Sequence, residues 1–171
     1  MKRCLMLDVD GVVVNGRPVD GKSWLTDIER DLGIAPASLH AHFFAGHWDA
    51  IVTGRKNLVE VLETCLPGIT RSASAQDLIN YWFEKDSRVD EAVLAECGEL
   101  RSRGMRIFLA TNQEHMRAQY LMDRLGLRNH VDGMIYSAEI TARKPERPFY
   151  EAALQRCGLA GGSLVGRIKP D

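Results

Sequence analysis

Apolar residues in the second half of the chain alternate between strand-length runs and helical spacing. Helices are expected where apolar positions recur every three or four residues, and strands where they form short continuous runs. The pattern predicts helices at 89–103, 113–125 and about 148–157, and strands at 105–110, 133–136 and 163–166. An apolar run at residues 4–7 adds a first strand. Helices and strands in alternation are typical of an α/β fold with a parallel sheet and crossover helices.

Residues 16–87 carry no convincing strand and are expected to be helical. Apolar positions at helical spacing predict helices at 21–33, from about 35, at 57–66 and at 74–85. Ser74 suits the N-cap of the last of these helices. A helical block of this length can pack on itself as a small bundle. We therefore predict an inserted helical domain at 16–87 and a core formed by residues 1–15 and 88–171.

Two aspartates, Asp8 and Asp10, follow the first strand and precede Gly11. Alternate side chains of an extended strand point the same way, so both carboxylates are expected to face one small volume. They repel each other there unless a cation or a shared proton is present, which predicts a metal site. The alternative is an Asp-Gly turn that leads into a hairpin. That alternative does not explain the second acid beside a buried strand.

Polar residues also follow two later strands. Thr111 and Asn112 come directly after one strand, and Lys144 lies in the loop after the next. Taken singly, Thr111 and Asn112 are more often a helix N-cap and Lys144 a solvated lysine. The carboxyl ends of parallel strands meet at the same edge of a sheet, so these groups are expected beside the two aspartates. Two acids, a hydroxyl donor and a lysine predict a phosphate site.

The composition excludes several classes of protein. Apolar residues make up 45% and charged residues 26% of the chain, and the net charge is −1, as in ordinary globular proteins. No basic excess is present to neutralise a nucleic-acid backbone. The cysteines are far apart and predict reduced core thiols; they stand at positions 4, 65, 97 and 157. The first apolar run is too short for a signal peptide or a membrane span, so we expect a cytoplasmic protein that does not bind membranes.

The order of these motifs resembles that of the haloacid dehalogenase superfamily. The stretch from Asp8 to Val12 looks like the first family motif, Thr111-Asn112 like the second and Lys144-Pro145 like the third. The resemblance implies a Rossmann-like parallel sheet with an inserted α-helical cap. It covers essentially the whole chain. Three cap residues point more closely to subfamily I, whose members include small sugar-phosphate phosphatases and the N-terminal phosphatase domain of epoxide hydrolases; they are Phe43, Trp48 and Gly54.

The same resemblance implies a role for each site residue. Asp8 would be the nucleophile that forms an aspartyl-phosphate, and Asp10 would protonate the leaving alkoxide and then activate water. Lys144 and Thr111 would complete the catalytic group. Phosphate or substrate would contact Gly11, Thr111, Asn112 and Lys144. The implied reaction is hydrolysis of a small phosphorylated metabolite with Mg²⁺, which would be bound by Asp8, Asp10 and Asp171.

The fourth family motif departs from its usual form. One or two acids normally follow a short apolar strand and complete the magnesium site, but here Arg167 follows the run at 163–166 and Asp171 is the sole candidate acid. The alternatives are an enzyme with an altered metal site, a truncated form, or an impaired protein that serves as a binding module. Asp10 disfavours dehalogenation, because family members with that activity lack this acid. The open sheet edge predicts low stability or a homodimer.

Several cap residues admit two interpretations. His40, His42 and His47 lie close together, but no four-ligand set of the zinc type accompanies them, so cap surface or substrate contact is favoured over a metal site. Arg55 could meet a distal group of the substrate, although a solvated arginine at a helix start is the simpler interpretation. The tryptophans are expected in the core of the cap; they are Trp24, Trp48 and Trp82.

Overall fold

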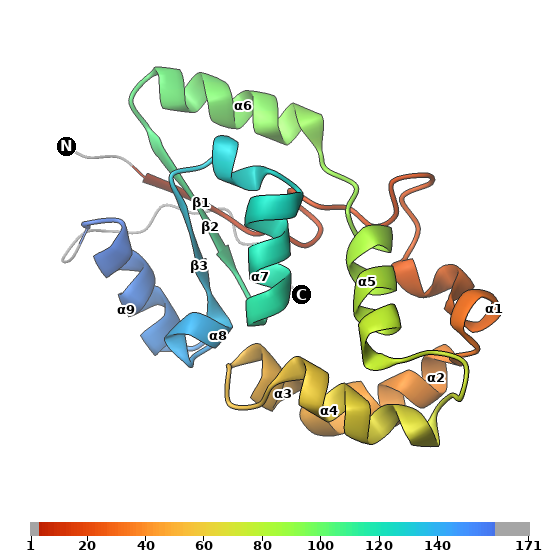
Figure 1. The fold of residues 1–171 in the computed structure, drawn as a ribbon. Helices are drawn as coiled ribbons and strands as arrows, with labels where there is room; N and C mark the ends of the chain where they lie inside the picture. The colour runs from red at the N-terminus through yellow and green to blue at the C-terminus, as the bar shows by residue number, and fades with distance from the viewer. Residues whose placement is uncertain (1–3, 160–171) are drawn as a thin grey trace.

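A computed structural model describes residues 4–159 of the chain. Within that range a parallel sheet is formed by β1 (Cys4–Leu7), β2 (Arg106–Thr111) and β3 (Gly133–Tyr136), in that order (Figure 1). Leu7 lies opposite Leu109 and Thr111 opposite Tyr136, so the ends of all three strands reach one edge. The α/β prediction is confirmed. The strand expected at 163–166, with Arg167 and Asp171, lies outside the described residues.

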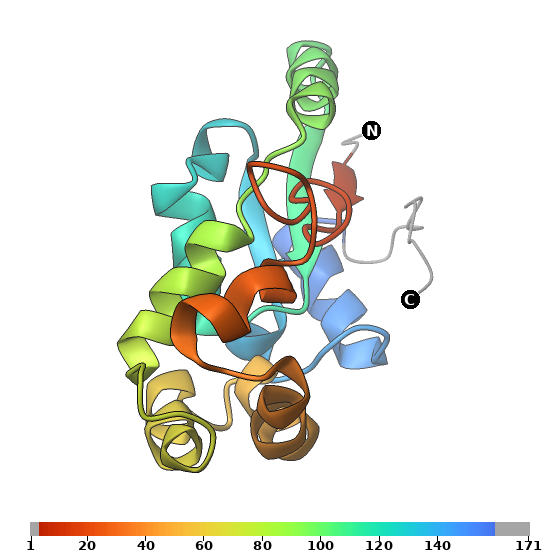
Figure 2. The same ribbon diagram turned by 90° about the vertical axis from the view of Figure 1, so that its right-hand side faces the viewer.

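Both faces of the sheet are covered by helices. Along β2, Ile107 and Leu109 join the hydrophobic cluster under α6 (Glu91–Ser102) and α7 (His115–Gln119). Phe108 and Ala110 join the cluster on the opposite face, under α9 (Arg147–Arg156). Figure 2 shows the strands between α7 on one side and α9 on the other. This alternation is the reason that β2 is apolar almost throughout.

Helix boundaries near the sheet differ from the expected ones at two places. The helix expected from residue 113 begins at His115, because the Glu114 carboxylate caps it and accepts the backbone N–H of Met116. A short helix, α8 (Ser137–Ile140), follows β3 where no helix was expected. The remaining turns after α7 are η4 (Tyr120–Arg124), which is π-helical, and η5 (Leu127–Asn129). α8 becomes important because it contacts the helical domain.

The segment 16–87 is helical, as expected, and contains no strand; all of it lies within the described residues. The helix that begins at Pro36 runs on through a π-helical turn to Val52. Ser74 caps the last helix in a capping box with Asp77, as predicted. The boundaries at 16 and 87 stay a prediction. The elements are η1 (Trp24–Asp27), α1 (Ile28–Leu32), α2 (Pro36–Leu39), η2 (His40–Phe44), α3 (Ala45–Val52), α4 (Leu58–Cys65), η3 (Leu66–Gly68) and α5 (Ala75–Lys85).

These helices have a hydrophobic core of their own. Its buried members all fall between Ile28 and Phe83. The Trp24 and Trp82 rings stack with centroids 5.2 Å apart, and Trp48 lies 5.7 Å from Trp82. All three tryptophans therefore belong to this cluster, which confirms their predicted place. We refer to residues 16–87 as the cap from here on.

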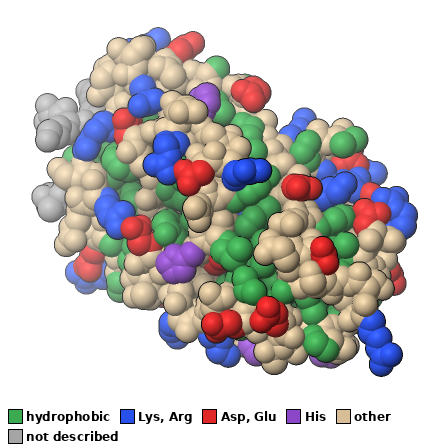
Figure 3. All heavy atoms as spheres, in the orientation of Figure 1, with side chains coloured by type: hydrophobic (Ala, Val, Ile, Leu, Met, Phe, Trp, Pro, Cys, Tyr) green, Lys and Arg blue, Asp and Glu red, His purple; other side chains and the backbone are tan. Residues whose placement is uncertain are grey.

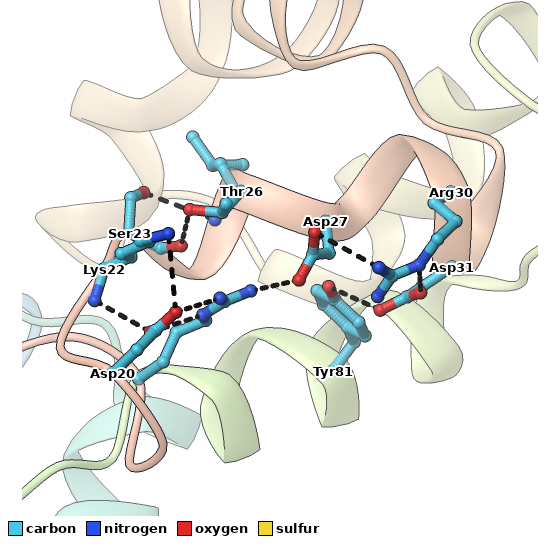
Figure 4. A network of polar contacts seen from close by, with 10 residues as sticks. Asp20, Lys22, Ser23, Thr26, Asp27, Arg30, Asp31 and Tyr81 are labelled. Carbon is cyan, nitrogen blue, oxygen red and sulfur yellow. Dashed lines mark hydrogen bonds and ion pairs between the residues drawn. The ribbon is translucent and has the colours of Figure 1, made fainter.

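A polar network on the cap surface ties its first helices to α5 (Figure 4). The Tyr81 hydroxyl donates to Asp31 over 3.0 Å, and Asp31 also accepts from Arg30 Nε over 2.8 Å. Near it, Asp27 pairs with Arg17. The contacts of Asp31 are exposed, so they orient the helices more than they stabilise them, whereas Arg17 is partly buried.

Charged side chains of both signs are interspersed over the face shown in Figure 3. No extended basic patch is visible on that face, as expected from the net charge of −1. In the described part of the chain, every helix is too short or too polar to cross a lipid bilayer.

Candidate active site

The turn after β1 places two carboxylates at the edge of the sheet. Val9, between them, is fully buried, so Asp8 and Asp10 project on the side away from the core. The Val14 and Val13 amides both donate to the Val9 carbonyl over 2.9 Å, which folds the chain tightly. Gly11 stands at φ +75°, a left-handed conformation that favours glycine. In the described sheet β1 pairs with β2, so the Asp-Gly turn does not lead into a hairpin on β1.

Asp8 is paired with Lys144. Lys144 Nζ lies 2.6 Å from Asp8 Oδ2, and the other oxygen of Asp8 accepts the Val9 backbone N–H over 2.8 Å. Both side chains are largely buried. Asp8 and Lys144 stand 136 positions apart in the chain, and they meet as the order of the strand ends predicts. The lysine charge is therefore balanced by the carboxylate of Asp8.

Asn112 holds the lysine loop in place. Its Oδ1 accepts the backbone N–H of Lys144 over 2.7 Å, and its Nδ2 donates to the Lys144 carbonyl over 3.2 Å. Both groups of the side-chain amide are therefore engaged with one residue. The side chain of Asn112 thus positions Lys144 in this structure, and its expected contact with phosphate stays a prediction.

Thr111, the last residue of β2, has an unsatisfied hydroxyl. The residue is 1% exposed, and its Oγ1 has no hydrogen-bond partner among the described residues. A buried hydroxyl without a partner costs about 1–3 kcal/mol, so such groups are uncommon outside functional sites. An oxygen of a bound phosphate would satisfy it, in agreement with the predicted role.

Asp10 has an unusual environment. It keeps solvent-accessible surface, yet the protein surrounds its carboxyl group closely enough that burial raises its pKa to about 6. The carboxylate of Asp86 raises this pKa further, whereas the guanidinium of Arg117 opposes the rise. Asp10 is therefore partly protonated near neutral pH, which suits a group that must both give and take a proton.

Gln113 is a site residue that sequence reasoning missed. It is 3% exposed, and its Nε2 donates to Asp10 Oδ2 over 2.6 Å. Its one available signal was its position directly after Thr111-Asn112, at the same strand end.

The metal prediction is only partly covered by the described residues. Asp8 and Asp10 provide two carboxylates, and Asp171 lies outside the described range. Between residues 4 and 159 no three His, Cys, Asp or Glu side chains are grouped as metal ligands. His42 instead contacts the Ser38 carbonyl over 2.9 Å, and His47 lies 3.5 Å from Lys56.

Cavity size does not identify this site. A cavity of about 520 Å³ opens on the cap between α4 and α5, and Val59, Leu66 and Arg71 are among its lining residues. None of the predicted site residues lines it. The site is recognised by its chemistry at the strand ends and not by its volume.

Comparison with known proteins agrees with this geometry. A protein-family model described as a hydrolase, haloacid dehalogenase-like hydrolase, matches residues 2–165. A search of curated proteins finds no match.

Solved structures with the same fold come from several bacteria. A HAD family enzyme from Bacteroides thetaiotaomicron, in complex with magnesium and inorganic phosphate, has a TM-score of 0.73 and 14% identity, over 93% of this chain and 80% of that one. A predicted HAD-like hydrolase from Porphyromonas gingivalis has a TM-score of 0.70 and 17% identity, over 92% and 77%. The L-2-haloacid dehalogenase from Xanthobacter autotrophicus, with chloropropionic acid covalently bound, has a TM-score of 0.61 and 16% identity, over 92% and 66%.

Proposed function

The chain belongs to the haloacid dehalogenase-like hydrolase family, and from that premise we propose that it is a magnesium-dependent phosphohydrolase acting on a small phosphorylated metabolite. The observation that supports the proposal most strongly is the environment of Asp10. A second carboxyl group, held near a pKa of about 6, stands two residues from the lysine-paired Asp8. Carbon–halogen cleavage does not need such a proton donor, whereas the departure of an alkoxide from phosphorus does.

In the first step the Asp8 carboxylate attacks phosphorus and the ester oxygen leaves. The leaving oxygen takes the proton of Asp10, so the products are the free alcohol and an aspartyl-phosphate. In the second step Asp10 removes a proton from water, which attacks the same phosphorus and releases inorganic phosphate and the Asp8 carboxylate. Lys144 and the Thr111 hydroxyl face the charge that develops on the phosphoryl oxygens.

The donor set fits a magnesium ion. The neighbouring carboxylates of Asp8 and Asp10 offer the hard oxygen ligands that Mg²⁺ prefers, with water completing the shell. When bound, the ion would supply positive charge that offsets the negative charge of Asp8 and of the phosphoryl group. The Bacteroides thetaiotaomicron enzyme with this fold was crystallised with magnesium and inorganic phosphate, which supports the same choice here.

The test is hydrolysis of p-nitrophenyl phosphate with and without magnesium, for the unaltered protein and for Asp8→Asn and Asp10→Ala. Magnesium-dependent turnover that both substitutions abolish is the expected result. Turnover that survives in Asp8→Asn would remove Asp8 as nucleophile. Halide release from 2-chloropropionate without metal would favour dehalogenation instead.

The binding-module alternative has its own signature. A folded protein that binds orthophosphate but hydrolyses no ester would favour it, because the Asp8–Lys144 pair and Thr111 form a phosphate site whether or not turnover follows. The cytoplasmic location, a homodimer and the absence of nucleic-acid partners stay predictions.

A further inference from the structure

The contact between Gln113 and Asp10 orients the carboxyl group of Asp10. Gln113 Nε2 can only donate, and it donates to Oδ2 over 2.6 Å. Because Oδ2 accepts this hydrogen bond, Gln113 holds the carboxyl group of Asp10 in one orientation. Gln113 itself is nearly inaccessible to solvent. It therefore acts on Asp10 without reaching a reacting atom.

The backbone of Gln113 is in turn held by α8. The Gln113 carbonyl accepts the N–H of Ala138 over 3.2 Å and lies 3.3 Å from the hydroxyl of Ser137. Ser137 is fully buried, and its Oγ lies 2.5 Å from the carbonyl of Val52 at the end of α3 in the cap. A serine hydroxyl has one proton, so it can donate to only one of these two carbonyls at a time. The contact with the Val52 carbonyl is the shorter one, so the serine hydroxyl donates its hydrogen bond to Val52 in this structure.

The same part of the cap presses on α8. Gly54 stands at φ +70°, and a Cβ built there would lie 2.4 Å from the Ala138 carbonyl oxygen. Nearby, Arg143 Nη1 pairs with Asp49 Oδ1 of α3 over 2.9 Å. The cap is thus seated directly on the segment that holds Gln113.

The other end of the cap is held differently. The guanidinium of Arg117, 1% exposed in α7, donates to the Phe83 carbonyl over 3.2 Å and also to the backbone of Asp86. It additionally pairs with the Asp86 carboxylate at 3.5 Å. One point of attachment is therefore a largely buried ion pair with several hydrogen bonds. The other has a single buried hydroxyl, a backbone contact and the exposed Arg143–Asp49 ion pair. The second is the easier to break.

We propose that Gln113 is a positioning residue for Asp10, and that Ser137 makes this positioning depend on whether the cap is seated. With the cap seated, Ser137 donates to Val52 and leaves the Gln113 carbonyl to Ala138. When the cap lifts at this point, the hydroxyl turns to the Gln113 carbonyl and draws the Gln113 segment away from Asp10. The acid is then correctly oriented only over a covered site, where water is excluded. This inference rests on the proposed function of Asp10 as the acid.

The first test detects the coupling between the cap and Gln113 without measuring enzyme activity. The ¹H–¹⁵N resonances of the Gln113 side-chain amide are recorded for the full protein, for Gly54→Ala and for the control Gly46→Ala. We expect Gly54→Ala to move these resonances and Gly46→Ala, whose added Cβ meets nothing within 4 Å, to leave them in place. In a Ser137→Ala background the shift caused by Gly54→Ala should fall by at least half.

Two results would overturn the proposed coupling of the cap to Gln113 through Ser137. An equal shift with and without the Ser137 hydroxyl would mean that Gly54 acts directly through Ala138 or His115. No shift in either background would mean that the cap does not reach Gln113. Asp49→Asn, which removes the ion pair to Arg143, serves as a second perturbation of the cap in case Gly54→Ala folds poorly.

The second test uses the leaving group. The parameter kcat/KM reports the step in which Asp10 donates its proton. Phenoxide is the conjugate base of an acid with a pKa near 10, so it needs that proton more than p-nitrophenoxide does. Gln113→Met should lower kcat/KM by about tenfold or more for phenyl phosphate, but by less than about threefold for p-nitrophenyl phosphate. The exposed Gln119→Met, at the end of the neighbouring helix α7, is the matched control.

Equal losses on both esters would show that Gln113 supports the fold and does not orient the acid. If the unaltered protein hydrolyses neither ester, the proposed function fails, and the resonance measurement still decides whether the cap and Gln113 are coupled.

Discussion

Asp10 has an environment that suits the two opposite proton transfers we propose for it. Burial and the Asp86 carboxylate disfavour its charged form and raise its pKa to about 6, while Arg117 limits the rise. The ordinary pKa of 3.8 applies in the unfolded chain. Between these two values the folded protein binds a proton that the unfolded chain does not. The free energy of unfolding of the metal-free protein therefore falls as pH rises from about 4 to about 6 because of this group.

Asp10→Asn should remove this pH dependence. The neutral amide cannot ionise, so the variant is expected to gain thermal stability relative to the unaltered protein as pH rises from 4 to 6, with a constant gain above that range. The measurement is the midpoint of thermal unfolding in EDTA across pH 4–8. A difference between the two proteins that does not change with pH would contradict the raised pKa.

Thr111 has a buried polar group that lowers the stability of the folded protein and that we propose binds phosphate. Its buried hydroxyl has no partner among the described residues. Thr111→Val keeps the shape and removes the unsatisfied group, so we expect the free energy of unfolding to rise by roughly 0.5–1 kcal/mol while inhibition by orthophosphate weakens. Chemical denaturation and inhibition assays measure the two effects.

Thr53→Val is the matched control for this prediction. Thr53 is equally buried, but its hydroxyl donates to the Asp49 carbonyl over 2.5 Å and accepts from Arg55 over 2.9 Å. The same substitution should therefore lower stability there by about 1 kcal/mol. If both variants lost stability alike, the Thr111 hydroxyl would have a partner in solution.

Among the elements, the loop after α3 and the short helix α8 matter most for the site. They are the point where the cap meets the ends of β2 and β3, through Ser137 and Gly54. Close approach of the two backbones requires that no side chain project from Gly54. A loop that must lie this close to a neighbouring carbonyl oxygen is also one that a single methyl group can displace.

Gly54→Ala and Gly46→Ala should have opposite effects on stability. At Gly54 the new Cβ meets the Ala138 carbonyl at 2.4 Å and the backbone is left-handed, so a loss of at least about 1 kcal/mol is expected. Gly46 lies inside α3 with no atom within 4 Å of its new Cβ, so alanine should stabilise that helix by up to about 1 kcal/mol. Urea denaturation of both variants provides the measurement, and a stable Gly54→Ala protein would argue against tight seating of the cap.

At the scale of the whole molecule, the hydrophobic core of the cap is joined to the sheet by polar contacts and by Met116 and Tyr120, which pack against the cap core. The cap core draws its buried residues from positions 28–83, and the sheet has clusters on both of its faces. Arg117 crosses from the sheet side to the C-terminal end of α5 and stacks against Phe83 and Tyr120. Burial lowers the pKa of the guanidinium because it disfavours the charged form. The carboxylate of Asp86 favours the charged form and opposes this effect. We therefore expect this contact to make the two parts unfold together.

Arg117→Met should weaken that coupling. Removal of one partner leaves the largely buried Asp86 carboxylate uncompensated, so a loss of roughly 2–4 kcal/mol is expected. Because the two cores would then be joined less firmly, thermal unfolding should broaden or separate into two transitions. The exposed Arg124→Met on the following turn should change stability by less than about 0.5 kcal/mol. A single sharp transition in Arg117→Met, near that of the control, would refute the coupling.

Much of the architecture followed from local sequence. Apolar runs predicted strands, as at β1, and capping residues predicted helix ends, as at Ser74. Both signals depend on residues that are close together in the sequence. The α/β class and the presence of Asp8, Thr111 and Lys144 at strand ends followed from the parallel connection rule. The same rule foretold that Asp8 and Lys144 would meet, and they lie 2.6 Å apart.

The remaining features were decided by the tertiary structure. Gln113 binds Asp10 across 103 residues, Ser137 reaches Val52 across 85, and Arg117 reaches Phe83 across 34. A glutamine, a serine and an arginine carry no local pattern that names such partners, and the raised pKa of Asp10 depends on all the groups around it. The sequence therefore determined which residues can do chemistry and on which elements they stand. Only the packing of the cap on the sheet decided how those residues are oriented, because orientation depends on contacts between segments far apart in the chain.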